Sequence, residues 1–336
     1  MKRKVKRNTG WVKEFFSILM FLFLFAYFAV SFKDQKEELK KNWEQRNTVE
    51  TAEKSESADK KILAIYEQLS ELPHNGKYYV VWEEEGVNLR LPAENFLIGA
   101  LAASIPASYE KEVLKAQAIL LRSTLFAEYE NGITEENDFC VHMEPDKSSF
   151  WTDYKMQSMW GKNYQEYVQK CAEAVAETQG IYLSYNGKAV KGFYHGMSAG
   201  RTRDEKELSG SGEYDYLREN MCTDNLSATD YSRVQRIRKT EAGELTERTA
   251  DEGGYVISVC RDGEKISGEA LRESLALASS NFTWEEDGEY YIFTTRGRGH
   301  GFGLDQYYGN LLAAEGEDYE QILSYFFADV TFNRME

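Results

Sequence analysis

The chain has 336 residues, of which 42% are hydrophobic and 29% charged, and its formal net charge is −16. This balance is typical of a globular protein with one large domain or two modest ones, and a content of 4 prolines and 14% aromatics excludes a disordered chain. The acidic excess excludes nucleic acid as an expected partner. The cysteines are too few for a disulfide scaffold, and the three pairings that they allow stay open: Cys140, Cys171, Cys222 and Cys260.

The N-terminus predicts a membrane anchor. Residues 1–14 form a basic tail, and residues 15–32 are an uncharged run rich in Phe. As a helix, this run reaches roughly 27 Å, about the thickness of the hydrocarbon core of a bilayer. The cations before it predict a single-pass cell-membrane protein with a cytoplasmic N-terminus and an extracytoplasmic remainder. A cleaved signal peptide is the rival interpretation, because "AVS" at 29–31 loosely resembles a cleavage site.

Residues 33–73 predict a charged stalk that ends in a short amphipathic helix, and residues 74–336 an ectodomain. In the ectodomain, "YYVVW" and "VNLRL" predict strands, the Asn-Gly turn in "IYLSYNGKAVKGFYHG" predicts a hairpin, and "GYVISVCRDG" and "EYYIFTTRG" predict later strands. Helices are expected at about 109–130, 163–178, 268–278, 304–315 and 318–327. Helices and antiparallel hairpins in mixed order predict an α+β fold, a single ectodomain with two lobes.

Three stretches have the composition of a functional site: 91–124, 193–202 and 297–309. In the third, four glycines surround His300, and such a bare backbone would let a large ligand approach the main chain. Its spacing does not fit a phosphate-binding P-loop. A serine hydrolase that uses Ser104 or Ser198 with His195 is conceivable, but neither serine lies in a G-x-S-x-G elbow.

Together and in this order, these stretches resemble the family of stage II sporulation protein D, also called the amidase-enhancer family. "LPAENFLIGALAASIPASYEKEVLKAQAILLRS" is similar to the family's opening block, in which Ala-Ala-Glu-Met-Pro-Ala precedes a Lys-Ala-Gln-Ala helix. "FYHGMSAGRT" is similar to its His-x-x-Ser-Gly-Gly-x-Thr block, and "ISGEALRESLALASSNF" to the segment before its final strand. "GRGHGFGLDQYYG" is similar to its Gly-x-Gly-His-Gly-x-Gly-Met-Ser-Gln signature. The resemblance covers about 87–330.

The resemblance implies a membrane-anchored lytic transglycosylase that acts on peptidoglycan glycan strands stripped of stem peptides. Such proteins work in engulfment during sporulation, alongside the stage II proteins M and P. The sugar's own hydroxyl closes a 1,6-anhydro ring, so one carboxyl acid/base is enough where ordinary glycosidases use two. By their positions in the blocks, the resemblance assigns glycan binding to Gln117, Arg122, His195, Ser198, Thr202, His300, Gly301 and Gln306. Arg122 and His300 also fit a second interpretation, as residues hydrogen-bonded inside the fold.

The chain departs from the family at the catalytic position. The family's acid is the Glu of Ala-Ala-Glu-Met-Pro-Ala, and Ser104 occupies this position. A serine hydroxyl cannot supply the proton, and loss of a general acid lowers the rate by about 10²- to 10⁴-fold. Glu94 and Asp305 are the candidates for a displaced acid. Three alternatives follow: a glycan-binding protein with weak or no cleavage, an active transglycosylase with a displaced acid, or an activator of a cell-wall amidase.

The resemblance also raises the question of zinc, which some relatives hold near the catalytic Glu through one His and two Cys. Cys140 matches one of these thiols and His142 lies beside it, but the second thiol position falls near Ser148. Two ligands fall short of the three or four that zinc sites use. We therefore expect no metal and no other cofactor.

Overall fold

A computed structural model describes residues 60, 62–69, 78–84, 87–131, 133–135, 138–143, 150–208 and 210–335. The predicted anchor at 15–32 and most of the predicted stalk lie outside these residues. Within the described residues, we find no helix that is long and apolar enough to cross a bilayer. Residues 62–69 are helical and precede the first strand.

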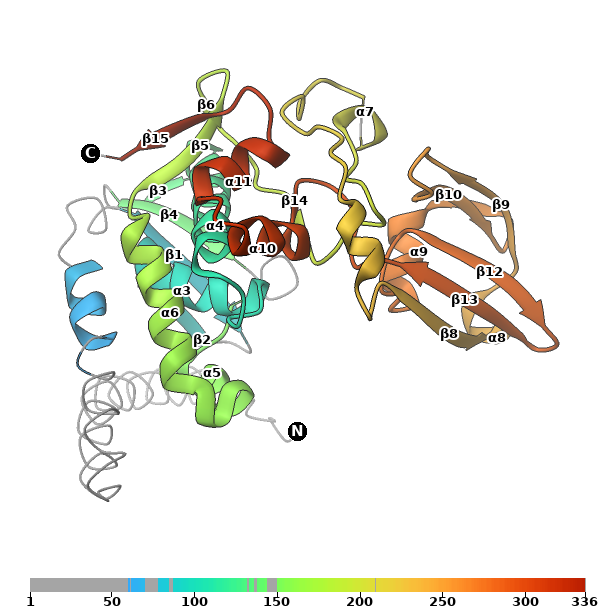
Figure 1. Cartoon of the computed structure of the whole chain (residues 1–336), viewed down its shortest axis with the longest axis horizontal. Coiled ribbons are helices and arrows are strands. Elements are labelled where there is room, and N and C mark those ends of the chain that lie inside the picture. The colour runs from blue at the N-terminus through green and yellow to red at the C-terminus, as the bar shows by residue number, and fades with distance from the viewer. Residues whose placement is uncertain are drawn as a thin grey trace, which may run out of the picture. The chain divides into compact units, whose positions relative to one another are not determined.

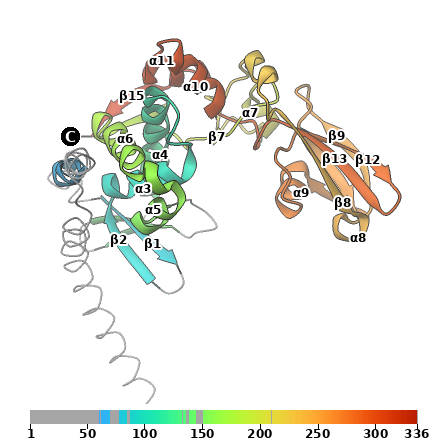
Figure 2. The same cartoon turned by 60° about the horizontal axis from the view of Figure 1, so that its bottom comes forward.

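The first layer of the fold is a small sheet with helices packed on it (Figure 2). The sheet has the order β2-β1-β4-β3, and its β1–β4 pair is parallel. Its strands are β1 (Tyr78–Glu84), β2 (Val87–Pro92), β3 (Ile133–Glu135) and β4 (Asp138–Met143). The helices are α3 (Ala93–Ser104), α4 (Lys111–Asn131), α5 (Asp153–Trp160) and α6 (Tyr164–Glu177), with the 3-10 turn η2 (Gly161–Asn163) before α6. The helix α3 was not predicted from the sequence.

The C-terminal segment completes this part of the molecule. Helices α10 (Gln306–Ala314) and α11 (Tyr319–Phe326) pack against α4, as Figure 1 shows. Beside them lies a sheet of order β15-β5-β6, built from β5 (Ile181–Tyr185), β6 (Lys188–Ala189) and β15 (Thr331–Arg334). A single apolar core runs from Leu69 to Phe327 through these elements. The first and last parts of the described chain therefore share one core.

Residues 228–299 form a β-rich part with its own core. One sheet has the order β12-β13-β8 and the other β11-β10-β9, and all four pairings are antiparallel. The elements are β8 (Ser232–Arg238), α8 (Lys239–Ala242), β9 (Leu245–Ala250), β10 (Val256–Arg261), β11 (Glu264–Ser267), α9 (Gly268–Ser274), β12 (Phe282–Asp287) and β13 (Tyr290–Arg296). Their buried apolar side chains, from Ile237 to Phe293, are separate from the first core. Mixed helices and antiparallel sheets confirm the predicted α+β class.

Two paired segments connect the cores. After β7 (Tyr194–His195) the chain runs toward the second core but still contributes Tyr216, Leu217 and Cys222 to the first. It returns to the first core at Phe302 and β14 (Leu304–Asp305), and β14 pairs with β7 in parallel. The outgoing segment contains α7 (Glu205–Leu208) and the 3-10 turn η3 (Thr223–Ser227). Isolated bridges join Met197 to Arg298 and Arg203 to Phe302. The second and third sequence blocks therefore lie side by side.

Candidate functional site

The glycine-rich segment, residues 297–303 at the start of the third stretch, is held against the outgoing segment by backbone hydrogen bonds. The amide of Met197 donates to the carbonyl of Arg298 at 3.1 Å, and the amide of Arg298 donates back at 2.7 Å. Further along, the amide of Leu304 donates to the carbonyl of Phe193 at 3.0 Å. This pairing places His195 directly beside Asp305.

The glycines of this segment pack against the protein itself. Gly299, Gly301 and Gly303 have φ angles of +100°, +85° and +69°, a region that favours glycine. A Cβ on Gly301 would lie 2.6 Å from the Tyr255 ring, and one on Gly303 would lie 2.1 Å from the carbonyl oxygen of Phe193. Close internal packing therefore accounts for these glycines without a ligand against their backbone.

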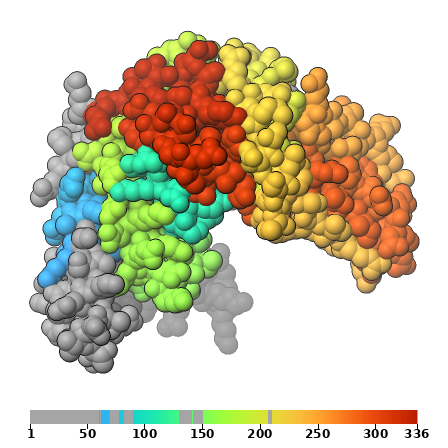
Figure 3. Space-filling model, viewed as in Figure 1, coloured from blue at the N-terminus to red at the C-terminus, as the bar shows by residue number. Residues whose placement is uncertain are grey.

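Ser104 lies at the end of α3, where residues from all three blocks meet. Its hydroxyl donates to the carbonyl of Leu101 at 3.2 Å, and its own carbonyl accepts a hydrogen bond from Nε2 of Gln306 at 2.7 Å. The same Nε2 donates to Oε1 of Gln117 at 3.1 Å. In Figure 3 the C-terminal segment, in red, lies directly against the teal part of the chain that contains α3 and α4. The structure thus brings together Ser104, Gln117 and Gln306, which the sequence blocks had singled out.

The hydrogen bonds at Ser104 fix the orientation of both glutamine amides. A backbone carbonyl only accepts, so Gln306 must direct its NH₂ group at Ser104, and Gln117 must then direct its oxygen at Gln306. The NH₂ group of Gln117 is left buried and without a hydrogen-bond partner among the described residues. A buried unpaired donor is unfavourable, so this amide is a place where an acceptor would be stabilised.

Tyr194 is a site residue that sequence reasoning missed. Its phenol hydrogen-bonds with Ser104, which lowers its pKa, while burial raises the pKa more strongly. The phenol therefore stays neutral near neutral pH. The sequence offered one signal for Tyr194, which is its place in the second block, two residues before Gly196. Because Tyr194 lies ninety positions after Ser104, no local pattern relates the two residues. Tyr194, Gln306 and Gln117, the side chains in this hydrogen-bonded group, are all uncharged.

Glu94 and Arg122 form an ion pair inside the first core. Nε and Nη2 of Arg122 donate to the two carboxylate oxygens of Glu94 at 2.8 and 2.7 Å, and both side chains are almost fully buried. The amide of Gly180 donates to the same carboxylate at 3.1 Å, and Arg122 also donates to the carbonyl of Ile181 at 3.0 Å. Both residues are thus engaged in linking α3, α4 and the start of β5. This arrangement fits the interpretation of Arg122 as a residue hydrogen-bonded inside the fold.

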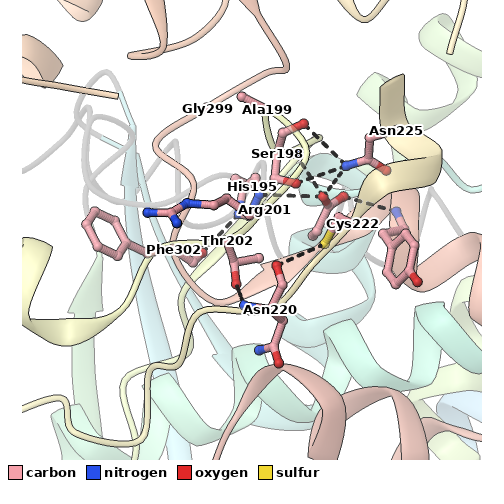
Figure 4. A network of polar contacts seen from close by, with 12 residues as sticks. His195, Ser198, Ala199, Arg201, Thr202, Asn220, Cys222, Asn225, Gly299 and Phe302 are labelled. Atoms are coloured by element: carbon pink, nitrogen blue, oxygen red, sulfur yellow. Dashed lines mark hydrogen bonds and ion pairs between the residues drawn. The ribbon is translucent and has the colours of Figure 1, made fainter. Parts of the chain in front are cut away.

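Asp305 is the centre of a second buried network, and Figure 4 labels His195, Ser198 and Asn225 of this network. Its carboxylate caps α10 by accepting from the amide of Tyr308 at 3.0 Å. It also accepts from the amide of Ser198 at 2.8 Å and from Nδ2 of Asn225 at 2.5 Å. Burial raises the pKa of the nearby Cys222 thiol, and the Asp305 carboxylate raises it further. Asp305 and Ser198 both have no solvent exposure, so this network holds the two connecting segments together.

The two histidines of the blocks are neutral. Nδ1 of His195 donates to the carbonyl of Phe302 at 3.0 Å, and burial lowers the pKa of His195 despite the Asp305 carboxylate, whose Oδ2 is 3.9 Å from Nε2. Nδ1 of His300 instead accepts from the amide of Phe302 at 3.1 Å. Burial, with the nearby His195, Arg272 and Arg203, lowers the pKa of His300 to about 3. Neither ring is therefore the acidic imidazolium at neutral pH.

Thr202 has a structural environment as well. Its hydroxyl donates to the carbonyl of Arg218 at 3.0 Å and accepts from the amide of Asn220 at 2.9 Å, so it fastens a bend in the outgoing segment.

Within the described residues, His, Cys, Asp and Glu form no group of three or more that could hold a metal ion. The side chains of Cys140 and His142, and the whole of Ser148, lie outside the described part of the chain, so the expectation about zinc stays a prediction.

Comparison with known proteins gives the class first. Residues 83–185, which include the first block, match the model of the family described as stage II sporulation protein. Together with the relatives below, this match confirms the predicted resemblance. Two relatives are each named stage II sporulation protein D. The chain is 28% identical over 256 residues to stage II sporulation protein D of Bacillus subtilis (strain 168), covering 70% of this chain and 73% of that protein. It is 27% identical over 265 residues to stage II sporulation protein D of Bacillus amyloliquefaciens, covering 73% and 75%.

Proposed function

We propose that this chain is a cell-wall protein of sporulation that binds peptidoglycan glycan strands and cleaves them weakly or not at all. The family match and the names of the two Bacillus relatives support the sporulation setting. The substrate follows from the resemblance of the sequence blocks. The anchor at 15–32 would tether the protein to the membrane, with the ectodomain outside the cell.

The environment of Ser104 is the observation that carries the proposal. The position that holds the family's acid has a serine hydroxyl, and its neighbours Tyr194, Gln117 and Gln306 are neutral. Protonation of a glycosidic oxygen needs a group that releases a proton near the working pH. None of these groups has such a pKa, whereas all of them can hydrogen-bond a sugar.

The displaced-acid alternative depends on Glu94 or Asp305. Glu94 is bound on both oxygens by Arg122, and Asp305 accepts hydrogen bonds from three donors. Both side chains are buried, so a glycan could reach them only after the fold opened. These contacts favour glycan binding over displaced-acid catalysis. Recruitment of a cell-wall amidase, or of the stage II proteins M and P, is a further role that glycan binding would support.

The proposal is tested at residue 104. Full-length protein in detergent is incubated with stem-free glycan strands, beside the variants Ser104→Glu and Ser104→Gln, and mass spectrometry detects 1,6-anhydro-muramic products. We expect binding by all three proteins and cleavage by Ser104→Glu alone. Gln has the same size as Glu without the acid, so it separates proton donation from shape.

Other results would change the assignment. Cleavage by the wild-type protein would require an acid other than residue 104. Failure of the wild-type protein to bind glycan strands would overturn the proposal outright. Stimulation of a purified cell-wall amidase by a protein that neither binds nor cuts strands would identify the activator alternative.

A further inference from the structure

Five arginines of the β-rich part form no ion pair within the described residues of this acidic chain: Arg233, Arg238, Arg248, Arg261 and Arg296. Two of them, Arg248 and Arg296, lie close together. The protein has 56 Asp and Glu against 40 Lys and Arg, and the nearby Arg201, Arg203 and Arg298 are each paired with a carboxylate. Arg248 and Arg296 are exposed and form no ion pair within the described residues. Their charges are therefore not neutralised locally.

The guanidinium of Arg248 is held in place by backbone carbonyls. Its Nε donates to the carbonyl of Phe282 at 3.1 Å, and its Nη2 donates to the carbonyl of Gly254 at 3.5 Å. Phe282 pairs with Thr295 in the β12–β13 ladder, which places Arg296 next along the chain. Burial lowers the pKa of Arg248, and the positive charge of Arg296 lowers it further. The two cations are thus neighbours, and an anion between them would relieve their repulsion.

The arginine pair is connected to the Ser104 region through Arg298. The guanidinium of Arg298 binds Asp230 at 2.6 Å and lowers the pKa of Tyr109, although burial raises that pKa overall. Tyr109 lies in the turn that follows Ser104. A polymer bound at Ser104 and Tyr109 would therefore lie near Arg298, and Arg296 is two residues before Arg298 in the chain.

Stem-free glycan strands, the ligand proposed above, carry carboxylates that guanidinium groups can bind. When a stem peptide is removed from N-acetylmuramic acid, the lactyl group is left with a free carboxylate, whereas the intact strand has an uncharged amide there. Guanidinium groups bind carboxylates through paired, charge-assisted hydrogen bonds. We propose that Arg248 and Arg296 form a subsite for the lactyl carboxylates of stem-free glycan strands. This inference rests on the proposed function, because it names the feature of the strand that the protein recognises.

The test changes the charge of the ligand first. Stem-free strands are compared with the same strands after their carboxylates are converted to methylamides, using the full-length protein at low salt. We expect the wild-type protein to bind the charged strands about tenfold tighter, the effect of one charged hydrogen-bonded contact. This comparison needs no variant, so it does not depend on the folding of one.

Variants then locate the subsite. Arg248→Gln combined with Arg296→Gln is expected to abolish the preference for charged strands, whereas the double Lys variant keeps part of it. Arg334→Gln, an equal charge change on the exposed end of β15, is the control and should leave the preference unchanged. Equal wild-type binding of both ligands, or an unchanged preference in the double Gln variant, would overturn the subsite and leave the proposed function standing. A wild-type protein that binds neither ligand would overturn both.

Discussion

The buried Glu94–Arg122 pair shows what single residues contribute to this fold. The pair joins the first turn of α3 to the middle of α4, and Arg122 also satisfies backbone carbonyls at the end of α6 and the start of β5. Desolvation makes such a pair a weak source of net stability, but loss of one partner leaves an uncompensated buried charge. The two residues therefore depend on each other.

We predict that Glu94→Gln lowers the free energy of unfolding by about 3–5 kcal/mol, because Arg122 is left buried without its counter-charge. Urea unfolding measures this loss. The double variant Glu94→Gln with Arg122→Met should recover part of it, since the unpaired cation is removed. A Glu94→Gln protein of normal stability would contradict the assignment of a structural role.

The pH dependence of stability follows from His300. Burial keeps its folded pKa at about 3, whereas an unfolded histidine titrates near 6.5. Protonation therefore favours the unfolded chain: the contribution is fully present above pH 6.5 and is lost as the pH falls toward 3. The slope of the unfolding free energy is at most about 1.4 kcal/mol per pH unit, the value for one proton bound by the unfolded chain and not by the folded one.

His300→Gln should flatten this slope between pH 6.5 and 4.5, as measured by urea midpoints at each pH. The nearby His195, whose pKa burial also lowers, will leave a residual slope. Equal slopes in the wild-type and variant proteins would show that His300 is solvated and titrates normally.

At the scale of elements, the sequence predicted most of the longer helices but missed α3. α4, α6, α10 and α11 begin and end within a few residues of their expected limits. α6 and α11 bury one face and expose another, whereas α4 is mostly buried and was predicted from its N-terminal signals and the spacing of its apolar residues. α3 buries nearly all of its side chains, so it shows no helical period that distinguishes it from a loop. The parallel β1–β4 pair was also missed, because strand pairing across some sixty residues leaves no local signal.

Two glycines, Gly303 in the connecting segment and Gly316 between α10 and α11, allow a test of how elements pack. Gly303 and Gly316 both have positive φ, of +69° and +103°, but only Gly303 has an atom close to its missing Cβ, at 2.1 Å. Gly316→Ala should destabilise by about 1–2 kcal/mol, the strain of a left-handed alanine. Gly303→Ala should lower the free energy of unfolding by about 1–3 kcal/mol more than Gly316→Ala does, because the methyl group would push β14 away from β7. Equal losses in the two variants, by urea unfolding, would show that the backbone angle alone requires these glycines.

At the scale of the molecule, the family blocks predicted which residues meet, and physical patterns did not. Ser104 and Gln306 are some two hundred residues apart, and only the block order suggested one site. The blocks did not show that residues 228–299 have a separate core or that Asp305 and Glu94 are buried. Those properties depend on long-range packing, which composition and spacing along the chain do not encode.

The two cores predict that the described chain opens in two steps. Phe293 is fully buried in the β-rich core and Leu114 in the helical core, and the segments between the cores are joined mainly by short bridges and the Asp305 network. Phe293→Ala should cost about 3–5 kcal/mol and raise amide hydrogen exchange in β10, β12 and β13 while α4 stays protected. Leu114→Ala, at a cost of about 2–5 kcal/mol, should produce the opposite pattern. If either variant raised hydrogen exchange equally in both parts, the Asp305 network would have to couple the two cores into one cooperative unit. In that case Asp305→Asn should uncouple the cores, so that each core variant raises exchange only in its own part.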